Sequence, residues 1–342
     1  MKKILLSLSL VVSLGASAQV LDSNDFSSLN IGNIGTDQTG TTAGQGGFYT
    51  INGLASDFQI VADDAAHGNV LQLTGSSTNT GSRYIWQNGL ADSWEFREEG
   101  NNIIEGEFDF FTGPVTTSKN NMSFYIFNDA GTDVLAGLTF QSDTKIIQGV
   151  AYYDATAQTG GVLGTYNFRL GTTNVVLAAN TWVRIGCSFN KTTGEVKWRG
   201  PGFNGFVIGA GIGTDPSEAD FVAAPNYATT PANAVANTVK FDNYTLKAVA
   251  VDGLLAVNNI ETAATAISVY PNPVSDIINV ANTQNVNVNR ITVTDVNGRI
   301  VKEAKYGNAS NVQMNVSDLS AGVYMMSINS DKGTSVKKIV KQ

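Results

Sequence analysis

The chain is poor in cysteine, histidine and charge. Its 342 residues include one cysteine, Cys187, and one histidine, His67, and 15% of them are charged. One cysteine excludes a disulfide-stapled scaffold and a cysteine-based zinc site, and one histidine excludes a multi-histidine metal centre within a single chain. Glycine, threonine, asparagine and serine are abundant in place of charged residues, which is typical of short strands joined by many turns. The composition therefore favours an all-β protein.

Charge is divided unevenly along the chain. Residues 19–250 contain 11 lysines and arginines against 22 acidic residues, a net charge of −11, whereas residues 266–342 contain 8 against 5, a net charge of +3. Binding to nucleic acid or to an anionic membrane needs clustered lysine and arginine, which the acidic part does not offer. We therefore expect two electrostatically different bodies and no nucleic-acid partner.

The first 18 residues have the pattern of an export signal. Lys2 and Lys3 precede an apolar run from Ile4 to Leu14, and small residues follow up to Ala18. This order predicts a signal peptide that is cleaved after Ala18. A transmembrane helix needs about 20 apolar residues, roughly twice the length of this run, so no transmembrane segment is expected.

Alternating apolar residues predict strands along the rest of the chain. In TWVRIGCSF every second residue from Val183 to Phe189 is apolar, which places Cys187 on a buried strand face as an inert thiol. No long stretch has helical periodicity. The pattern predicts a large antiparallel sandwich over residues 19–250, a linker over 251–266 and a second β body over 267–342.

Four short motifs follow one another in residues 267–342. They read YPNPVSD, VTDVNGRIV, DLSAGVYMMSI and KKIVK. Prolines break the first strand, Asn-Gly between alternating segments indicates a hairpin, and the last two motifs predict strands. The residues that define the motifs are Pro271, Asn272, Pro273, Asp295, Gly298, Arg299, Gly322, Tyr324 and Lys338.

This ordered set resembles the type A C-terminal sorting domain of the Bacteroidota type IX secretion system. The resemblance covers the whole of residues 267–342. It implies a small immunoglobulin-like sandwich of seven strands, recognition by the type IX secretion machinery and export across the outer membrane. It also implies that the domain is removed and that the mature protein is attached to surface lipopolysaccharide. The expected location is therefore outside the cell or on its outer surface.

The large body resembles the concanavalin A-like lectin/glucanase superfamily. The resemblance rests on the start Leu21–Leu29, on Asn180–Ile185 with Thr193–Val196 in the middle, and on the ending Val239–Leu246. It implies an antiparallel jelly-roll sandwich over residues 19–250. Two functions compete for such a body, the cleavage of a glycan and the binding of one.

Cleavage by a laminarinase-type glycoside hydrolase needs two carboxyl groups about 5 to 5.5 Å apart. Those enzymes carry Glu-x-Asp-x-x-Glu on one strand, and here Glu107 and Asp109 occupy the first two positions. Thr112 stands where the second glutamate would be, so the acid/base is missing and an enzyme is less expected than a binding protein. Glu105, Glu107 and Asp109 share one strand face, which is also the pattern of a solvated strand or of a ligand-contacting one.

Aromatic side chains gather in residues 83–96, RYIWQNGLADSWEF. Tyr84, Trp86 and Trp94 offer rings on which a sugar could stack, and Glu107 beside them would complete a binding groove. The same rings are common in protein cores, so packing is the alternative for each.

Calcium is the one cofactor that the sequence suggests. Hard cations take carboxylate and backbone oxygens, and Asp22 or Asp25 with Asp242 would place such oxygens where the first and last strands of the body pair. Ordinary turn and edge carboxylates are the alternative. His67 is expected in an exposed turn, and Trp182 on a packed strand.

The sequence thus predicts a secreted or cell-surface protein whose body binds a polysaccharide, a cell-surface glycan or another surface ligand without catalysis. A glycoside hydrolase with an atypical site around Glu107 and Asp109 is the first alternative. A structural adhesin with no small-molecule site is the second.

Overall fold

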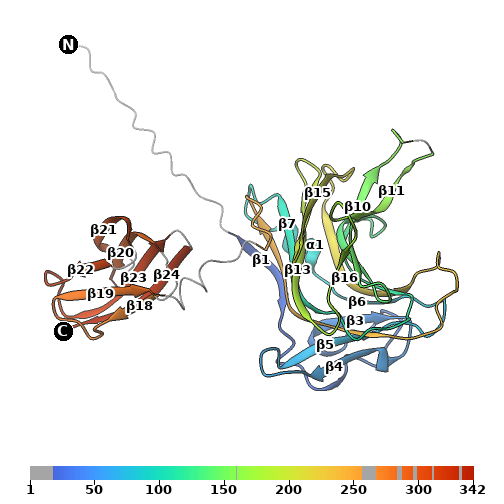
Figure 1. The fold of residues 1–342 in the computed structure, drawn as a ribbon, viewed down its shortest axis with the longest axis horizontal. Helices are drawn as coiled ribbons and strands as arrows, with labels where there is room; N and C mark the ends of the chain where they lie inside the picture. The colour runs from blue at the N-terminus through green and yellow to red at the C-terminus, as the bar shows by residue number, and fades with distance from the viewer. Residues whose placement is uncertain are drawn as a thin grey trace, which may run out of the picture. The chain divides into compact units, whose positions relative to one another are not determined.

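The chain forms two compact units that divide between Leu255 and Ala256 (Figure 1). The structure is a computed structural model that describes residues 18–158, 160–255, 267–282, 287–295, 299–309, 312–330 and 333–342. Residues 1–17 of the predicted signal peptide and residues 256–266 of the predicted linker lie outside this part of the chain.

Two antiparallel sheets make up the first unit. The strands of the nine-stranded sheet are β1 (Gln19–Asn24), β2 (Gly32–Asn33), β4 (Phe58–Ala62), β5 (Asn69–Thr74), β7 (Ile103–Phe111), β13 (Trp182–Asn190), β14 (Glu195–Gly200), β15 (Phe203–Ile208) and β17 (Thr238–Val249). They run in the order β15, β14, β13, β7, β17, β5, β4, β2, and β1 pairs with the second half of β17.

The strands of the eight-stranded sheet are β3 (Phe48–Ile51), β6 (Arg83–Gln87), β8 (Asn120–Asn128), β9 (Val134–Gln141), β10 (Ile146–Asp154), β11 (Leu163–Arg169), β12 (Val175–Val176) and β16 (Pro216–Pro225). They run in the order β11, β10, β9, β8, β16, β6, β3, with β12 on β10. Along the sequence the chain changes sheet several times, as it does in a jelly roll.

Helix is scarce in the described residues. It is confined to α1 (Leu90–Glu95) and to the 3-10 turns η1 (Gln45–Gly47) and η2 (Ala55–Asp57). No helix in this part of the chain is long and apolar enough to cross a membrane.

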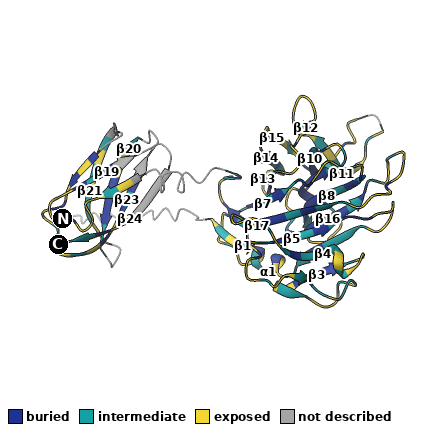
Figure 2. Ribbon diagram, turned by 60° about the horizontal axis from the view of Figure 1, so that its bottom comes forward, coloured by how far each residue is buried: buried dark blue, intermediate teal, exposed yellow. Residues whose placement is uncertain are grey.

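Alternation along the strands explains why the two sheets face one another across a single core. Ile104, Phe108 and Phe110 of β7 point inward and are at most 1% exposed, and Ile185 and Cys187 of β13 do the same. Figure 2 shows buried residues concentrated on the strands and exposed ones on the connecting loops. The predicted large all-β sandwich and the buried cysteine are confirmed.

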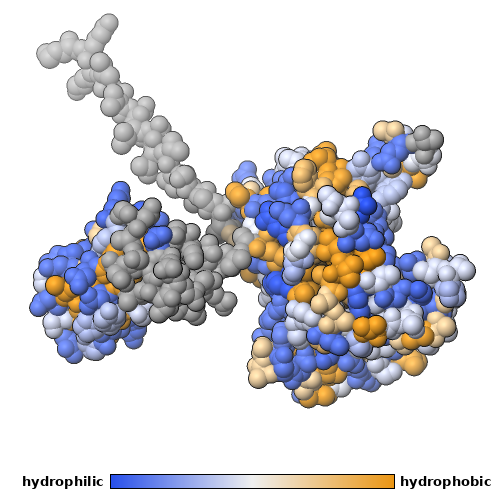
Figure 3. All heavy atoms as spheres, in the orientation of Figure 1, coloured by the Kyte–Doolittle hydropathy of each residue, from blue (hydrophilic) through white to orange (hydrophobic). Residues whose placement is uncertain are grey.

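One edge of the nine-stranded sheet carries exposed apolar side chains. Phe206 and Ile208 on β15 are 68% and 51% exposed, and Ile212 in the next loop is 59% exposed. Figure 3 shows apolar side chains gathered over this part of the body. Within the described ranges no strand pairs with the free edge of β15.

The second unit is a small sandwich with seven described strands. One sheet contains β18 (Ile267–Tyr270), β19 (Ile277–Asn282) and β22 (Val312–Asn315), and the other contains β20 (Val288–Thr294), β21 (Ile300–Ala309), β23 (Gly322–Ser330) and β24 (Gly333–Lys341). Their inward side chains, among them Ile278, Val293 and Met326, form a separate core. The seven-stranded sandwich implied by the resemblance to the sorting domain is confirmed.

The first sorting motif attaches the end of the chain to the small sandwich. Asn272, between Pro271 and Pro273, donates a hydrogen bond from Nδ2 to the Lys338 carbonyl and accepts one on Oδ1 from the Val340 amide, both at 2.8 Å. The amide side chain thus takes the place of a strand neighbour for β24.

The other sorting motifs also have structural roles. The Tyr324 hydroxyl donates to the backbone carbonyl four residues earlier at 2.9 Å, and the Arg299 Nε pairs with Asp295 at 3.2 Å. Gly322 begins β23, and Gly298 lies outside the described residues.

Candidate functional site

Aromatic and carboxyl side chains line up across the outer face of the eight-stranded sheet. The register places Asp220 on β16 opposite Trp86 on β6 and opposite Tyr125 on β8. The neighbours of Asp220 and Tyr125 along their strands and the residue before Trp86 belong to the core. Since side chains alternate along a strand and opposite residues share a face, the three form one row on the outside.

Trp86 stands at one end of this row in a fixed orientation. Its ring stacks on Tyr49 of the edge strand β3, with centroids 5.7 Å apart and planes at 20°, and its Nε1 donates to Asn88 Oδ1 at 3.0 Å. Gly40, at φ 74°, lies so close that a Cβ there would come within 2.9 Å of the ring. Neighbouring groups therefore orient the ring before any ligand arrives.

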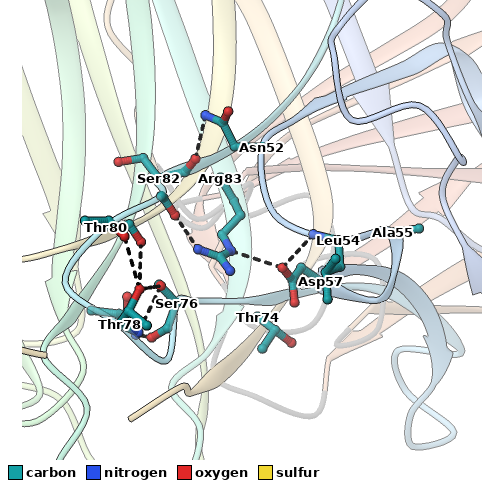
Figure 4. A network of polar contacts seen from close by, with 12 residues as sticks. Asn52, Leu54, Ala55, Asp57, Thr74, Ser76, Thr78, Thr80, Ser82 and Arg83 are labelled. Atoms are coloured by element: carbon teal, nitrogen blue, oxygen red, sulfur yellow. Dashed lines mark hydrogen bonds and ion pairs between the residues drawn. The ribbon is translucent and has the colours of Figure 1, made fainter. Parts of the chain in front are cut away.

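Strand β6 is anchored at its start by a polar network (Figure 4). The Arg83 Nε pairs with Asp57 Oδ2 at 3.1 Å, and both side chains are 13% exposed. In the preceding loop, hydrogen bonds of 3.0 and 3.2 Å link the hydroxyls of Ser76, Thr78 and Thr80. This network fixes where β6 begins and so positions the two aromatic rings that the strand carries on its outer face.

Tyr125 occupies the middle of the row. Its ring has room because Gly137 faces it from β9, where a Cβ would lie 2.7 Å from the ring. Ser123 and Thr139, whose hydroxyls are 2.8 Å apart, lie beside the Tyr125 hydroxyl. Burial raises the pKa of Tyr125, so the group remains a neutral hydroxyl that can donate and accept.

Glu218 and Asp220 bring two carboxyl groups to this row. They are two residues apart on β16 and point to the same face. Asp220 is 3% exposed, and burial together with the nearby Glu218 charge raises its pKa well above the usual range; burial also raises the pKa of Glu218. The pair therefore shares a proton near neutral pH. Apart from this shared proton, the Oδ1 atom of Asp220 has no hydrogen-bond donor within the described part of the chain, although buried polar atoms normally have a partner.

We name Tyr84, Trp86, Tyr125, Glu218 and Asp220 the tyrosine–carboxyl face. It offers ring surfaces, hydroxyls, a carboxyl that can donate and an oxygen that can accept, which suits the apolar faces and hydroxyls of a sugar. The two carboxyls hydrogen bond to each other, whereas those of a retaining glycosidase stand about 5 to 5.5 Å apart around the bond that they cleave. The face thus lacks a separated acid and nucleophile.

The predicted ligand residues are divided among different places. Tyr84 and Trp86 lie on the tyrosine–carboxyl face. Trp94, on α1, is 1% exposed and donates from Nε1 to Asp215 at 2.6 Å, so it packs in the core and lines no surface. Glu107 lies on β7 in the other sheet, with the core between it and the two rings.

The acidic face of β7 is covered, not solvated. Glu105 and Glu107 are 2% and 7% exposed, and they accept hydrogen bonds from the backbone amides of residues 253 and 255. Glu107 also accepts from Arg184 Nη2 at 3.2 Å. Little of Glu107 is left for a substrate, because its two oxygens are already occupied.

Residues 252–255, which we name the strap, are attached to the outer face of the nine-stranded sheet. Asp252 pairs with Lys197 at 3.2 Å, and Arg199 Nη1 donates to the Leu254 carbonyl at 2.8 Å. The Leu254 side chain is 0% exposed. A segment far along the sequence thus closes the strand face that carries Glu105 and Glu107.

The three predicted calcium ligands do not form one group. Burial raises the pKa of Asp22 on β1, next to the Tyr244 hydroxyl. Asp25 lines a polar pocket of about 370 Å³ between β1 and β17. Asp242 lies with His67 and Asp109 instead: one ligand atom from each of these three lies within 4.8 Å of the others.

The sequence analysis missed Tyr125, Glu218 and Asp220. A signal for the two carboxyls is present in Ser-Glu-Ala-Asp, where they alternate at the start of an apolar strand. The same Glu-x-Asp spacing occurs at Glu107 and Asp109. The spacing alone does not tell which of the two strand faces is covered by another segment of the chain.

Comparison with known proteins identifies the small sandwich. Residues 268–342 match the family described as "Secretion system C-terminal sorting domain". A search of curated protein sequences found no match to the chain.

Solved structures resemble the chain only distantly. A sialidase has a TM-score of 0.38 and 10% identity over 64% of this chain and 18% of its own, so this chain spans about a fifth of its length. The cellulose induced protein Cip1 has a TM-score of 0.39 and 12% identity over 67% of this chain and 97% of its own. The alginate lyase vAL-1 from Chlorella virus has a TM-score of 0.38 and 11% identity over 55% of this chain and 88% of its own. Such values do not bear on the activity of the body.

The family match and the motif residues agree on the same segment. The hydrogen bonds of Asn272 and Tyr324 and the ion pair of Arg299 all lie within the sandwich that the family match covers. Residues 268–342 are therefore a type IX secretion C-terminal sorting domain, and the chain is a secreted or surface-attached protein.

Proposed function

We propose that the body of this secreted protein binds a polysaccharide or cell-surface glycan at the tyrosine–carboxyl face without cleaving it. The observation that carries the proposal is the Oδ1 atom of Asp220, which is buried and, apart from the proton shared with Glu218, has no hydrogen-bond donor among the described residues. A buried acceptor without a donor costs about 1–3 kcal/mol, and a sugar hydroxyl would supply that donor.

Rings around this oxygen supply the apolar part of recognition. Trp86 and Tyr125 flank Asp220 in the row, and Tyr84 stands on the same strand as Trp86, two residues away. Tyr227, 58% exposed, hydrogen bonds to Ser82 at 3.0 Å and extends the aromatic lining toward solvent. Aromatic faces pack against the C–H faces of pyranose rings while the hydroxyls are held by polar groups.

The charge of the row favours a neutral glycan. Neither lysine nor arginine occurs in the row of opposite residues Tyr49, Trp86, Asp220, Tyr125, Gly137, Val150 and Asn167. A uronate or sulfate group would meet two carboxyls and no cation, which costs free energy.

Two features favour binding over cleavage. The carboxyls of Glu218 and Asp220 share a proton with each other and do not flank a bond. Ala223 occupies the position five residues after Glu218, where a laminarinase-type motif has its second glutamate, and it is 0% exposed. No second glutamate therefore stands on this strand.

The test is a screen of the full chain against neutral and acidic polysaccharides, with reducing ends measured in parallel. We expect binding to at least one neutral glycan, no release of reducing ends, and at least tenfold weaker binding for Asp220→Ala. The matched control is Glu107→Gln, a carboxyl of the other sheet, which should bind as the wild type does.

Two results would contradict the proposal. Release of reducing ends that Glu107→Gln abolishes would support a hydrolase on β7. Absence of binding to every glycan would support a structural adhesin.

A further inference from the structure

We infer that His67, Asp109 and Asp242 form a binding site for a divalent transition-metal ion such as Zn²⁺. One ligand atom from each residue lies within 4.8 Å of the other two. Zinc bonds to nitrogen and oxygen are about 2.1 Å long, so atoms on one ion stand roughly 3 to 4 Å apart, and small side-chain rotations close the difference. The site lies on the nine-stranded sheet and does not depend on the proposed function.

Three separate segments bring these groups together. Asp109 on β7 and Asp242 on β17 are directly opposite in the strand register, and His67 comes from the turn between β4 and β5. A register shift follows Asp242 on β17, where Asn243 has φ 47°. The two carboxyls therefore stand on a rigid pair of neighbouring strands, while the histidine reaches them from a loop.

His67 is held in the orientation that a metal ligand needs. Its Nδ1 lies 2.9 Å from Asp64 Oδ1, and its ring stacks on Trp182 with centroids 4.1 Å apart and planes at 14°. The His67 side chain is 15% exposed, so it is not the free turn residue that the sequence suggested. In metal sites the second ring nitrogen of a ligating histidine is usually held by a carboxylate or carbonyl. The bond to Asp64 leaves Nε2 for an ion.

Asp242 gives the independent indication that a cation belongs here. It is 1% exposed, and no lysine or arginine in the described ranges forms an ion pair with it. Its hydrogen-bond donors are the backbone N and the Nδ2 of the next residue, Asn243, at 2.7 and 3.2 Å. Buried charges in proteins are paired with an opposite charge or coordinate a metal, and no lysine or arginine of the described residues supplies that charge for Asp242.

Two cationic side chains near Asp109 and Asp242 form ion pairs with other carboxylates. Lys240 pairs with Asp63 at 2.8 Å. Arg184 is shared between Glu107 at 3.2 Å and Asp109 at 3.5 Å. A polar pocket of about 370 Å³ lies next to Asp242 along the chain, since Asn243 lines it together with Asp25.

The donor set points to a transition metal and away from calcium. Calcium takes oxygen ligands almost exclusively, whereas an imidazole nitrogen with two carboxylates suits zinc and its neighbours in the first row. Cys187, 0% exposed in the core, does not compete for such an ion.

The experiment titrates the chelator-treated full chain with ZnCl₂ by isothermal calorimetry. We expect one Zn²⁺ per chain, at least 100-fold weaker binding for His67→Ala and for Asp242→Asn, and no displacement by millimolar CaCl₂. Asp154→Asn, an exposed carboxylate on β10, is the matched control and should bind zinc as the wild type does.

A second measurement does not depend on any variant being folded. The chain has one histidine, so the imidazole signals in the NMR spectrum of the wild type belong to His67 and should shift in proportion to added Zn²⁺ up to one equivalent. Unchanged imidazole signals, zinc binding that survives His67→Ala, or displacement by calcium would each overturn the inference.

Discussion

Glu105 lies under the strap with 2% of its surface exposed, and burial raises its pKa to about 7 from 4.5. The folded state therefore favours the neutral carboxyl more than the unfolded state does. A raised carboxyl pKa gives stability that is complete below about pH 4.5 and is lost as the pH rises to about 7.

We predict that replacing Glu105 by glutamine removes this pH dependence. From pH 5 to pH 8, the free energy of unfolding of the wild type should fall by up to about 3 kcal/mol more than that of Glu105→Gln, since one pKa unit corresponds to about 1.4 kcal/mol. Urea unfolding at the two pH values measures the difference. Glu99→Gln, at an exposed position, should follow the wild type; parallel falls for Glu105→Gln and wild type would refute the assignment.

Individual site residues could be predicted only in part. Tyr84 and Trp86 are predicted as ligand candidates because aromatic residues cluster in residues 83–96. Glu107 and Glu218 both precede an aspartate by two residues, and the sequence does not show that a segment 148 residues away covers Glu107. His67 was underestimated for the same reason, since its stacking and carboxylate partners come from distant strands.

The strap is the element on which the outer face of the nine-stranded sheet depends. Leu254 fills a site above Gly186 of β13, where an added Cβ would lie 2.8 Å from the leucine. Backbone amides of the strap donate to Glu105 and to Glu107 Oε1, two buried acceptors that would each lose this donor without the strap. Loss of the strap should therefore cost both apolar burial and hydrogen bonding.

We predict that Leu254→Ala lowers the free energy of unfolding of the body by about 2–4 kcal/mol, as for other buried leucines. Chemical denaturation of the full chain, followed by tryptophan fluorescence, measures the change. Leu54→Ala provides the matched control, because Leu54 is 66% exposed and its loss should cost less than about 0.5 kcal/mol. Equal effects of the two substitutions would mean that the strap is not a packed element.

At the level of strands, sequence periodicity is sufficient to predict where the strands lie, but it does not predict which strands pair. Alternation predicts β7, β8, β13 and β17, because apolar residues at alternate positions of each strand enter the core. Which sheet a strand joins is decided by contacts between distant residues, so sequence patterns placed Trp86 and Glu107 in one groove although they belong to opposite sheets.

At the scale of the whole molecule, the two units divide two tasks. Residues 268–342 match a secretion sorting domain and carry the net positive charge, whereas the acidic body carries the candidate sites. We predict that deletion of residues 267–342 keeps the protein inside the cell, as measured by immunoblotting of cell and medium fractions. A deleted chain that still reaches the medium would show that export does not require this domain.

The central claim is that the body binds a glycan through the outer face of its eight-stranded sheet. The most direct test compares two tryptophans of opposite sheets, Trp86 on β6 and Trp182 on β13, by calorimetric titration of the glycan found in the polysaccharide screen. We predict that Trp86→Ala weakens binding at least tenfold and that Trp182→Ala leaves it unchanged. Of these two tryptophans, only Trp86 stands on the sheet face that carries Asp220. Full affinity in Trp86→Ala, or a loss confined to Trp182→Ala, would contradict the account.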